Sequence, residues 1–263
     1  MVTPNQEVGG KVVLVTGSNG DIGRELVLAF RAAGVAEVIE VGGRNAPDGV
    51  NRLDVTDAAG VFSLASSLEG KVDILVNSAG INDNVGILSA ESADHARREM
   101  EVNYFGLLNV VRAFAPPMRD RRQGVIVNML SILSHVNLPI CGSYCASKAA
   151  AYSLTQAIRG ELAPYNVRVC GVFPAAVDTR MSIKSPPPKL APKELANHVI
   201  LALREGIEDL YPGVVAERMH AALRSAPKSL EKALSARLPE GTLQSTARGL
   251  LARTIIKRPS DLT

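Results

Sequence analysis

The sequence of 263 residues has no tryptophan, only four histidines and three cysteines, and no long uninterrupted hydrophobic run. The odd number and the spacing of Cys141, Cys145 and Cys170 do not match a metal site, so we predict reduced thiols and no bound metal. Cys141 and Cys145 lie four residues apart, which leaves a redox pair as the alternative to two small buried side chains.

Other absences exclude further classes of protein. A membrane-spanning helix needs ~20 consecutive apolar residues, and no run approaches that length. Residues 1–7 carry neither the basic stretch nor the apolar core of a secretory signal, so we expect a soluble, cytoplasmic protein. Aromatic residues make up 4% of the chain and are not interleaved with basic ones, which argues against nucleic-acid binding.

Short β-rich runs alternate with helical patterns along the chain. The expected strands cover residues 12–16, 37–41, 50–53, 74–77, 125–130 and 167–173, and the expected helices cover residues 22–33, 57–68, 91–118, 143–163 and 193–205. Such alternation predicts parallel strands joined by right-handed crossovers, with helices on both faces of the sheet. With 46% apolar residues, the chain can fill the core of one large domain. We therefore predict a doubly wound α/β domain over residues 1–263.

A glycine-rich turn follows the first expected strand and precedes the first expected helix. It contains Gly17, Gly20 and Gly23. Glycine is needed where the turn must be tight, the backbone must approach a diphosphate and the helix must pack near the strand. Phosphate then meets free amides at the start of the helix. An ordinary strand-to-helix turn is the alternative, but three glycines at this spacing favour nucleotide binding.

Tyr144 and Lys148 lie four residues apart, so a helix would present a phenol and an ammonium on one face. Ser131 stands thirteen residues before Tyr144, at the end of an expected strand. A nearby cation lowers the pKa of a phenol, so these three side chains predict a proton-transfer unit. The Tyr144–Lys148 spacing alone also occurs by chance on exposed helix faces.

The carboxyl ends of several expected strands carry polar residues or turn formers. Gly17, Asn77, Ser131 and Pro174 all lie at such ends. Ligands of a parallel sheet bind beyond the carboxyl ends of its strands, so these four residues are expected to converge on one crevice.

Taken in order, these motifs resemble the short-chain dehydrogenase/reductase family over residues 10–180. The similar segments are the glycine turn at 16–23, the acidic turn at 53–55, residues 77–80 and residues 173–179. Ser78 and Ala175 replace an asparagine and a glycine of the family pattern. The resemblance implies a Rossmann-type, mainly parallel sheet of about seven strands in the order 3-2-1-4-5-6-7. It also implies a homodimer or homotetramer.

The resemblance assigns residues of this chain to the site. The implied catalytic residues are Asn103, Ser131, Tyr144 and Lys148. The implied cofactor contacts are Gly17, Ser18, Asn19, Gly20, Asp21, Ile22, Gly23, Arg44, Asp54, Val55, Asn77, Ala79, Gly80, Tyr144, Lys148, Pro174, Val177 and Thr179.

The family pattern also implies a role for each catalytic side chain. Tyr144 is the general acid when a ketone is reduced and the general base when an alcohol is oxidised. Lys148 lowers the pKa of the phenol and binds the nicotinamide ribose, while Ser131 polarises the carbonyl oxygen. Asn103 supports a water molecule that links Lys148 to solvent. From the residues alone, Asn103 is equally well read as a helix-interior asparagine bonded locally.

The choice of cofactor depends on the end of the second expected strand. Gly42 and Gly43 stand where an acidic side chain would repel a 2′-phosphate, and Arg44 follows. Arginine pairs well with phosphate, so NADP(H) is preferred over NAD(H), unless Arg44 is only a solvated turn residue. Residues 45–52 are too few and too rich in turn formers for a helix, so a loop should lead directly to the third strand.

The substrate side is mostly apolar. The residues expected around the substrate are Ile132, Leu133, His135, Leu138, Cys141 and Met181, with Ser131, Leu133, His135 and Tyr144 in direct contact. These side chains predict a largely apolar ketone or secondary alcohol. A surface position is the alternative for His135. Residues 181–192 contain four prolines and predict a stiff lid or linker over the substrate.

The last third of the chain departs from the family. We divide it into a substrate segment with a helix and a last strand (181–213) and a helical tail (214–263). The tail has nine Lys and Arg against four Asp and Glu, a balance of +5, and breaks at Pro227 and at 239–241 separate three helical stretches. A helical cap over the substrate is preferred; contact with a membrane or an acidic partner is the alternative.

Two functional classes follow. The first is an NADP(H)-dependent oxidoreductase, such as a carbonyl reductase or alcohol dehydrogenase, that acts on a small-molecule substrate. The second is a sensor or scaffold that binds the cofactor without turnover. The intact set of Ser131, Tyr144 and Lys148 favours the enzyme, because a sensor does not need a proton-transfer unit. Dehydration and epimerisation are the less favoured reactions on the same scaffold.

Overall fold

A computed structural model describes residues 8–43, 45–88, 90–183 and 185–236. Its centre is a seven-stranded parallel sheet with the order β3-β2-β1-β4-β5-β6-β7. The strands are β1 (Val12–Thr16), β2 (Glu37–Gly42), β3 (Asn51–Arg52), β4 (Ile74–Asn77), β5 (Gly124–Met129), β6 (Val167–Val172) and β7 (Asp209–Leu210). The predicted fold class and strand order are confirmed.

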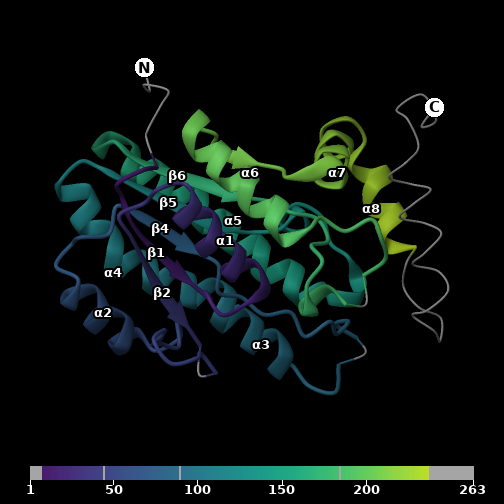
Figure 1. The fold of residues 1–263 in the computed structure, drawn as a ribbon. Helices are drawn as coiled ribbons and strands as arrows, with labels where there is room; N and C mark the ends of the chain where they lie inside the picture. Colours follow the sequence, from purple (N-terminus) through teal and green to yellow (C-terminus); the bar gives the residue numbers. More distant parts are fainter. Residues whose placement is uncertain (1–7, 44, 89, 184, 237–263) are drawn as a thin grey trace.

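Helices cover both faces of the sheet (Figure 1). One face packs against α1 (Asp21–Ala32) and α6 (Pro192–Glu205), and the other against α2 (Ala58–Ser67), α4 (Leu107–Asp120) and α5 (Gly142–Leu162). Neighbouring strand residues serve opposite faces, since Val13 lies in the first apolar cluster and Leu14 in the second. The central strands are therefore mostly apolar, as expected for doubly covered strands.

The expected helix at 91–118 is three consecutive segments. The chain forms α3 (Asp94–Met100), a π-helical segment (Glu101–Gly106) and then α4, which continues to Asp120. The π-helical segment contains Asn103, whose side chain bonds to distant parts of the chain. Such π segments are frequent where a helix serves a functional site.

The connections and the tail follow the sequence-based expectations where they are described. No helix forms among residues 45–50, so a loop joins β2 to β3. The first two helical stretches of the tail are α7 (Gly213–Ser225) and α8 (Pro227–Ser235), and the third lies outside the described residues. Figure 1 shows α7 and α8 together at one end of the molecule.

Candidate active site

The turn between β1 and α1 is too crowded for side chains at two of its glycines. Gly17 has φ of +67°, and a Cβ on it would lie 2.8 Å from the Cα of Ala79. A Cβ on Gly23 would lie 2.1 Å from the carbonyl oxygen of Gly17. The Thr16 hydroxyl accepts hydrogen bonds from the amides of Ser78 (3.1 Å) and Ala79 (3.3 Å). The glycine turn is therefore held directly against the turn that follows β4.

A groove of about 310 Å³ opens beside this turn. The expected cofactor contacts that line it are Gly17, Asn19, Gly20, Ile22, Gly23, Asp54, Val55, Ala79, Gly80 and Thr179. Gly43, Ser78 and Ile81 also line it, and sequence reasoning did not assign them. These residues come from five separate stretches of the chain, four at the carboxyl ends of β1 to β4 and one, Thr179, after β6.

Other expected cofactor contacts lie elsewhere. Ser18 is fully buried, and its hydroxyl has no hydrogen-bond partner among the described residues. Asn77 donates to the side-chain oxygen of Asn128 on the neighbouring strand at 2.9 Å. Pro174 and Val177 line a second cavity next to the groove. Arg44, on which the choice of cofactor depends, lies outside the described residues.

Asp21, another expected cofactor contact, joins the glycine turn to the segment after β6. Its carboxylate accepts a hydrogen bond from the backbone amide of Arg180 at 2.8 Å and lies 3.3 Å from Nε of the same arginine. Arg24 pairs with it from the other side at 3.1 Å. The bond from the Arg180 amide lowers the pKa of Asp21, so the carboxylate stays ionised and its charge is balanced locally.

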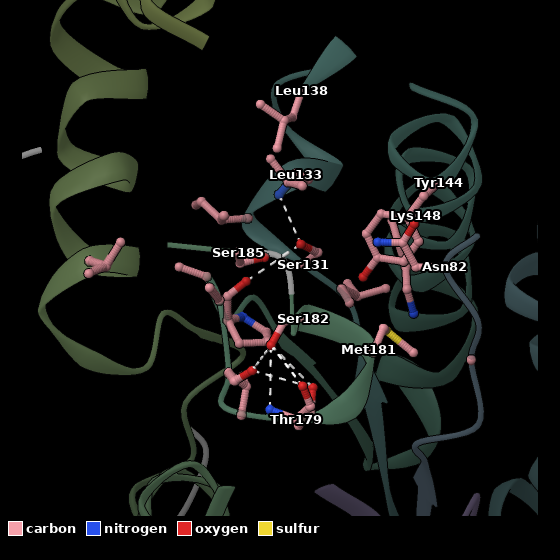
Figure 2. Close-up of a pocket in the computed structure, with 18 of the residues that line it drawn as sticks. Asn82, Ser131, Leu133, Leu138, Tyr144, Lys148, Thr179, Met181, Ser182 and Ser185 are labelled. Atoms are coloured by element: carbon pink, nitrogen blue, oxygen red, sulfur yellow. Dashed lines mark hydrogen bonds between the residues drawn. The ribbon is translucent and has the colours of Figure 1, made fainter. Parts of the chain in front are cut away.

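The second cavity brings the expected proton-transfer residues together. It has a volume of about 240 Å³, and Ser131, Tyr144 and Lys148 all line it. Tyr144 and Lys148 are 9% and 6% exposed. The Lys148 ammonium donates to the carbonyl oxygen of Met129 at 2.8 Å and lies 5.9 Å from the centre of the Tyr144 ring. Figure 2 shows Tyr144 and Lys148 side by side on α5, with Ser131 next to them.

The expected lowering of the Tyr144 pKa is wrong in this structure. Burial raises the pKa of this phenol, and the hydrogen bond with Ser131 acts in the opposite direction. Burial also lowers the pKa of Lys148 to about 8. Surroundings of low polarity favour the neutral form of both groups, and burial is the largest cause of both shifts. The spacing in the sequence carries no information about burial, and the prediction failed for that reason.

Asn103 is buried and anchors the loop that follows β4. Its side-chain oxygen accepts from the Ile81 amide at 2.9 Å, and its nitrogen donates to the Ile81 carbonyl and the Ser147 hydroxyl, each at 2.9 Å. These partners are 22 and 44 residues away, so the alternative of local bonding is wrong. A Cβ on Gly80 would lie 3.1 Å from the Asn103 oxygen and 3.4 Å from the Lys148 nitrogen. Asn103 and Lys148 therefore face the same glycine.

The cavity contains some of the expected substrate residues but not all of them. Ile132, Leu133, Leu138 and Met181 line it, as expected. His135 does not; its ring packs with those of Tyr152, Phe173 and Tyr211, and the Tyr211 hydroxyl lies 3.2 Å from its Nε2. Cys141 is buried beside Cys145, with 4.0 Å between the two sulfur atoms. The structure thus places both residues behind the cavity wall.

Besides Ser78, four polar residues of the cavity were missed. They are Asn82, Asn84, Ser182 and Ser185. A signal existed for the first two, because they follow the carboxyl end of β4, where ligands of a parallel sheet bind. Among the described residues, no group of three or more His, Cys, Asp or Glu side chains could hold a metal ion. Nor is any described helix both long and apolar enough to cross a membrane.

The order of motifs and the geometry agree with a comparison to known families, since the model of short chain dehydrogenases matches residues 11–189. The chain belongs to the short-chain dehydrogenase family. The matched residues include the glycine turn, Asn103, Ser131, Tyr144, Lys148 and Thr179.

Named relatives of this short-chain dehydrogenase are of moderate similarity. Dehydrogenase/reductase SDR family member 7B of Mus musculus is 32% identical over 196 residues, which are 66% of this chain and 60% of that protein. An uncharacterized oxidoreductase of Mycobacterium tuberculosis is 32% identical over 223 residues, 76% of this chain and 65% of that protein. The chain therefore spans about three fifths of the length of the first of these relatives.

Solved structures of short-chain dehydrogenases have the same fold. One from Burkholderia cenocepacia J2315, in complex with NADP, has a TM-score of 0.81 and 37% identity and covers 87% of this chain and 99% of that one. Another, from Streptomyces avermitilis, has a TM-score of 0.74 and 27% identity, and the match covers 85% of this chain and 96% of that one.

Proposed function

We propose that this enzyme transfers a hydride between NADP(H) and a largely apolar ketone or secondary alcohol, with Tyr144 as the general acid or base. One observation carries the proposal: Ser131, Tyr144 and Lys148 line a single cavity that adjoins the glycine-turn groove. The two spaces share Ile22, Ser78, Gly80, Thr179 and Met181. A substrate carbonyl and a dinucleotide could thus be bound next to each other.

The residues of the groove fit a dinucleotide. Gly17 and Gly23 have no room for a Cβ, so the turn packs closely, and it lines the groove where a diphosphate could meet the backbone amides at the start of α1. Gly43 lines the groove beyond the end of β2, where no acidic side chain would repel a 2′-phosphate. The structure from Burkholderia cenocepacia was determined with NADP, and it is 37% identical to this chain. We therefore favour NADP(H), with Arg44 as the phosphate partner, over NAD(H).

The chain's own side chains would handle the proton. The bound nicotinamide supplies hydride to the carbonyl carbon in reduction and accepts it in oxidation. The Ser131 hydroxyl holds and polarises the carbonyl oxygen, and the Tyr144 hydroxyl gives its proton to that oxygen. A phenol titrates near 10 and burial raises the pKa of Tyr144 further, so the hydroxyl carries a proton at neutral pH that it can donate. The Lys148 ammonium then stabilises the phenolate until a proton returns from solvent.

Asn103 would serve the return of that proton. A small cavity of about 10 Å³ lies between Asn103 and Lys148. A space of ~10–15 Å³ with polar partners holds one water molecule. We propose that a water at this place links the Lys148 ammonium to solvent, in addition to the bonds by which Asn103 fixes Ile81.

The test is turnover by the variant Tyr144→Phe, measured by NADPH absorbance with a panel of apolar ketones. Loss of the proton donor should lower kcat by about 100-fold or more, while NADPH affinity is kept. Tyr152→Phe is the matched control, because Tyr152 lies on the same helix but packs against His135 and Phe173 outside the cavity. Full carbonyl-reducing turnover by Tyr144→Phe would overturn the mechanism.

For the assembly we propose a homodimer or homotetramer that pairs through the helices carrying Asn103 and Tyr144. The π-helical segment next to α4 presents Phe105 with 43% of its surface exposed, which supports this location. Sedimentation of the wild type and of Phe105→Glu checks the proposal, and the variant should dissociate toward smaller species.

A further inference from the structure

The two C-terminal helices form part of the cavity wall. Helix α7 contributes Val215 and Met219, and α8 contributes Leu234. All three positions lie beyond the residues matched by the family model, 11–189. Figure 2 shows the olive C-terminal ribbon on one side of the cavity, and Tyr144 with Lys148 on the other. This part of the wall therefore faces the reacting groups from across the cavity.

The wall is packed and not a loose flap. Met219 and Leu234 are only 4% and 2% exposed, and both belong to one apolar cluster with Ile132, which directly follows Ser131. The position of the wall is therefore coupled by packing to the residue that would hold the substrate oxygen. A densely packed wall sets a fixed limit on the length of a ligand.

Polar groups gather on other walls of the same cavity. Asn82, Asn84 and Ser182 come from the loop after β4 and from the segment after β6, and Asn84 donates to the carbonyl oxygen of Met181 at 3.3 Å. In Figure 2, Asn82 lies beside Tyr144 and Lys148. Burying a polar substituent against Met219 and Leu234 would leave it without a hydrogen-bond partner, which is costly. An apolar substituent is accepted there without that cost.

We propose that Met219 and Leu234 determine substrate specificity by forming an apolar end wall for the larger substituent of the substrate. The substrate class is then a ketone or secondary alcohol with one extended apolar group, alkyl or aryl, which points from the carbonyl toward α7 and α8. This inference rests on the proposed function, because it concerns the same cavity.

The chain offers a matched control in Leu230. This residue is 6% exposed, lies one turn before Leu234 on α8 and belongs to the same apolar cluster, but it does not line the cavity. Leu230→Ala should lower the melting temperature as Leu234→Ala does. It should not change which ketone is preferred. The control thus separates loss of packing from loss of the wall.

The experiment measures kcat/KM with NADPH for straight-chain methyl ketones from butanone to decanone. For the wild type, kcat/KM should rise about fourfold for each methylene that contacts the wall, and then fall once the chain is too long. Met219→Ala and Leu234→Ala should move the ketone length with the highest kcat/KM to longer ketones, because each substitution removes part of the wall and leaves space behind it. Met219→Phe should move the highest kcat/KM to shorter ketones. This variant tests the wall even if an alanine variant does not fold.

An optimum that stays the same in Met219→Ala, Leu234→Ala and Met219→Phe would overturn the inference, and so would an equal shift in Leu230→Ala. Calorimetric titration of the same ketones separates this failure from failure of the proposed function. Suppose that the wild type shows no turnover, and that the dependence of binding on ketone length changes in Met219→Ala but not in Leu230→Ala. This result would support the role of the wall and refute the proposed reaction. Turnover with an unchanged length dependence would remove only the wall.

Discussion

Replacing Asn103 with alanine should destabilise the protein as well as slow the reaction. The substitution removes the bonds from Asn103 to the amide and the carbonyl of Ile81 and to the Ser147 hydroxyl. Ser147 keeps a partner, because its hydroxyl also donates to the Tyr144 carbonyl at 2.8 Å. The two backbone groups of Ile81 lose theirs.

The loss can be worked out from these contacts. A buried polar group left without a partner costs about 1–3 kcal/mol, and the partly buried Ile81 loses two, so we expect a loss of about 2–4 kcal/mol. In a protein of this size, 1 kcal/mol changes the melting temperature by about 2–4 °C. The variant Asn103→Ala should therefore melt roughly 10 °C lower than the wild type.

Urea unfolding and thermal melting followed by circular dichroism measure this change. Asn109→Ala is the matched control, because Asn109 makes one side-chain bond, to the Val55 carbonyl at 3.1 Å, and should lose about 1 kcal/mol. If Asn103→Ala lost no more free energy of unfolding than Asn109→Ala, the anchoring role of Asn103 would be refuted.

Three further predictions concern Lys148, Gly23 and Asp21. The pKa of Lys148 is about 8 in the folded protein against 10.5 for a free lysine, so the stability of the wild type relative to Lys148→Met should rise between these two pH values. A difference in urea unfolding that does not depend on pH would contradict this. Gly23→Ala places a Cβ 2.1 Å from the Gly17 oxygen and should abolish the enhancement of NADPH fluorescence on binding; unchanged affinity would show that the turn can relax. Asp21→Ala loses the bond from the Arg180 amide and should cost about 1–2 kcal/mol in urea unfolding, whereas Arg180→Gln should be nearly neutral because that guanidinium is exposed. Equal losses in both variants would assign the stabilisation to the ion pair.

Most of the sheet could be predicted from the sequence, for a physical reason. A strand covered by helices on both faces is mostly apolar, and such a run is conspicuous between turn formers. Within this pattern β1 and β4 were predicted residue for residue, and β5 and β6 within one residue at each end. The division of residues 1–263 into core, substrate segment and tail stays a prediction.

The failures have a common cause, because each depended on contacts between distant parts of the chain. The chain changes from an α-helix to a π-helical segment at Glu101, where Asn103 forms hydrogen bonds with Ile81 and Ser147. The apolar pattern of the sequence does not indicate these distant partners. His135 is close to Ser131 in sequence, but its orientation is set by Tyr211, 76 residues further on. Local spacing predicted that Ser131, Tyr144 and Lys148 lie together, and they line one cavity, but their burial and orientation needed the folded structure.

The strand order also has a consequence for synthesis on the ribosome. Val13 of β1 lies between Val38 of β2 and Ile74 of β4, so one edge of β1 has no partner until β4 has been made. Ala79, against which Gly17 packs, comes later still. Pairing across long stretches of chain is slow, because the intervening loop must first be ordered. A nascent chain that ends before β4 therefore cannot form the glycine-turn groove, although it already contains all three glycines of the turn.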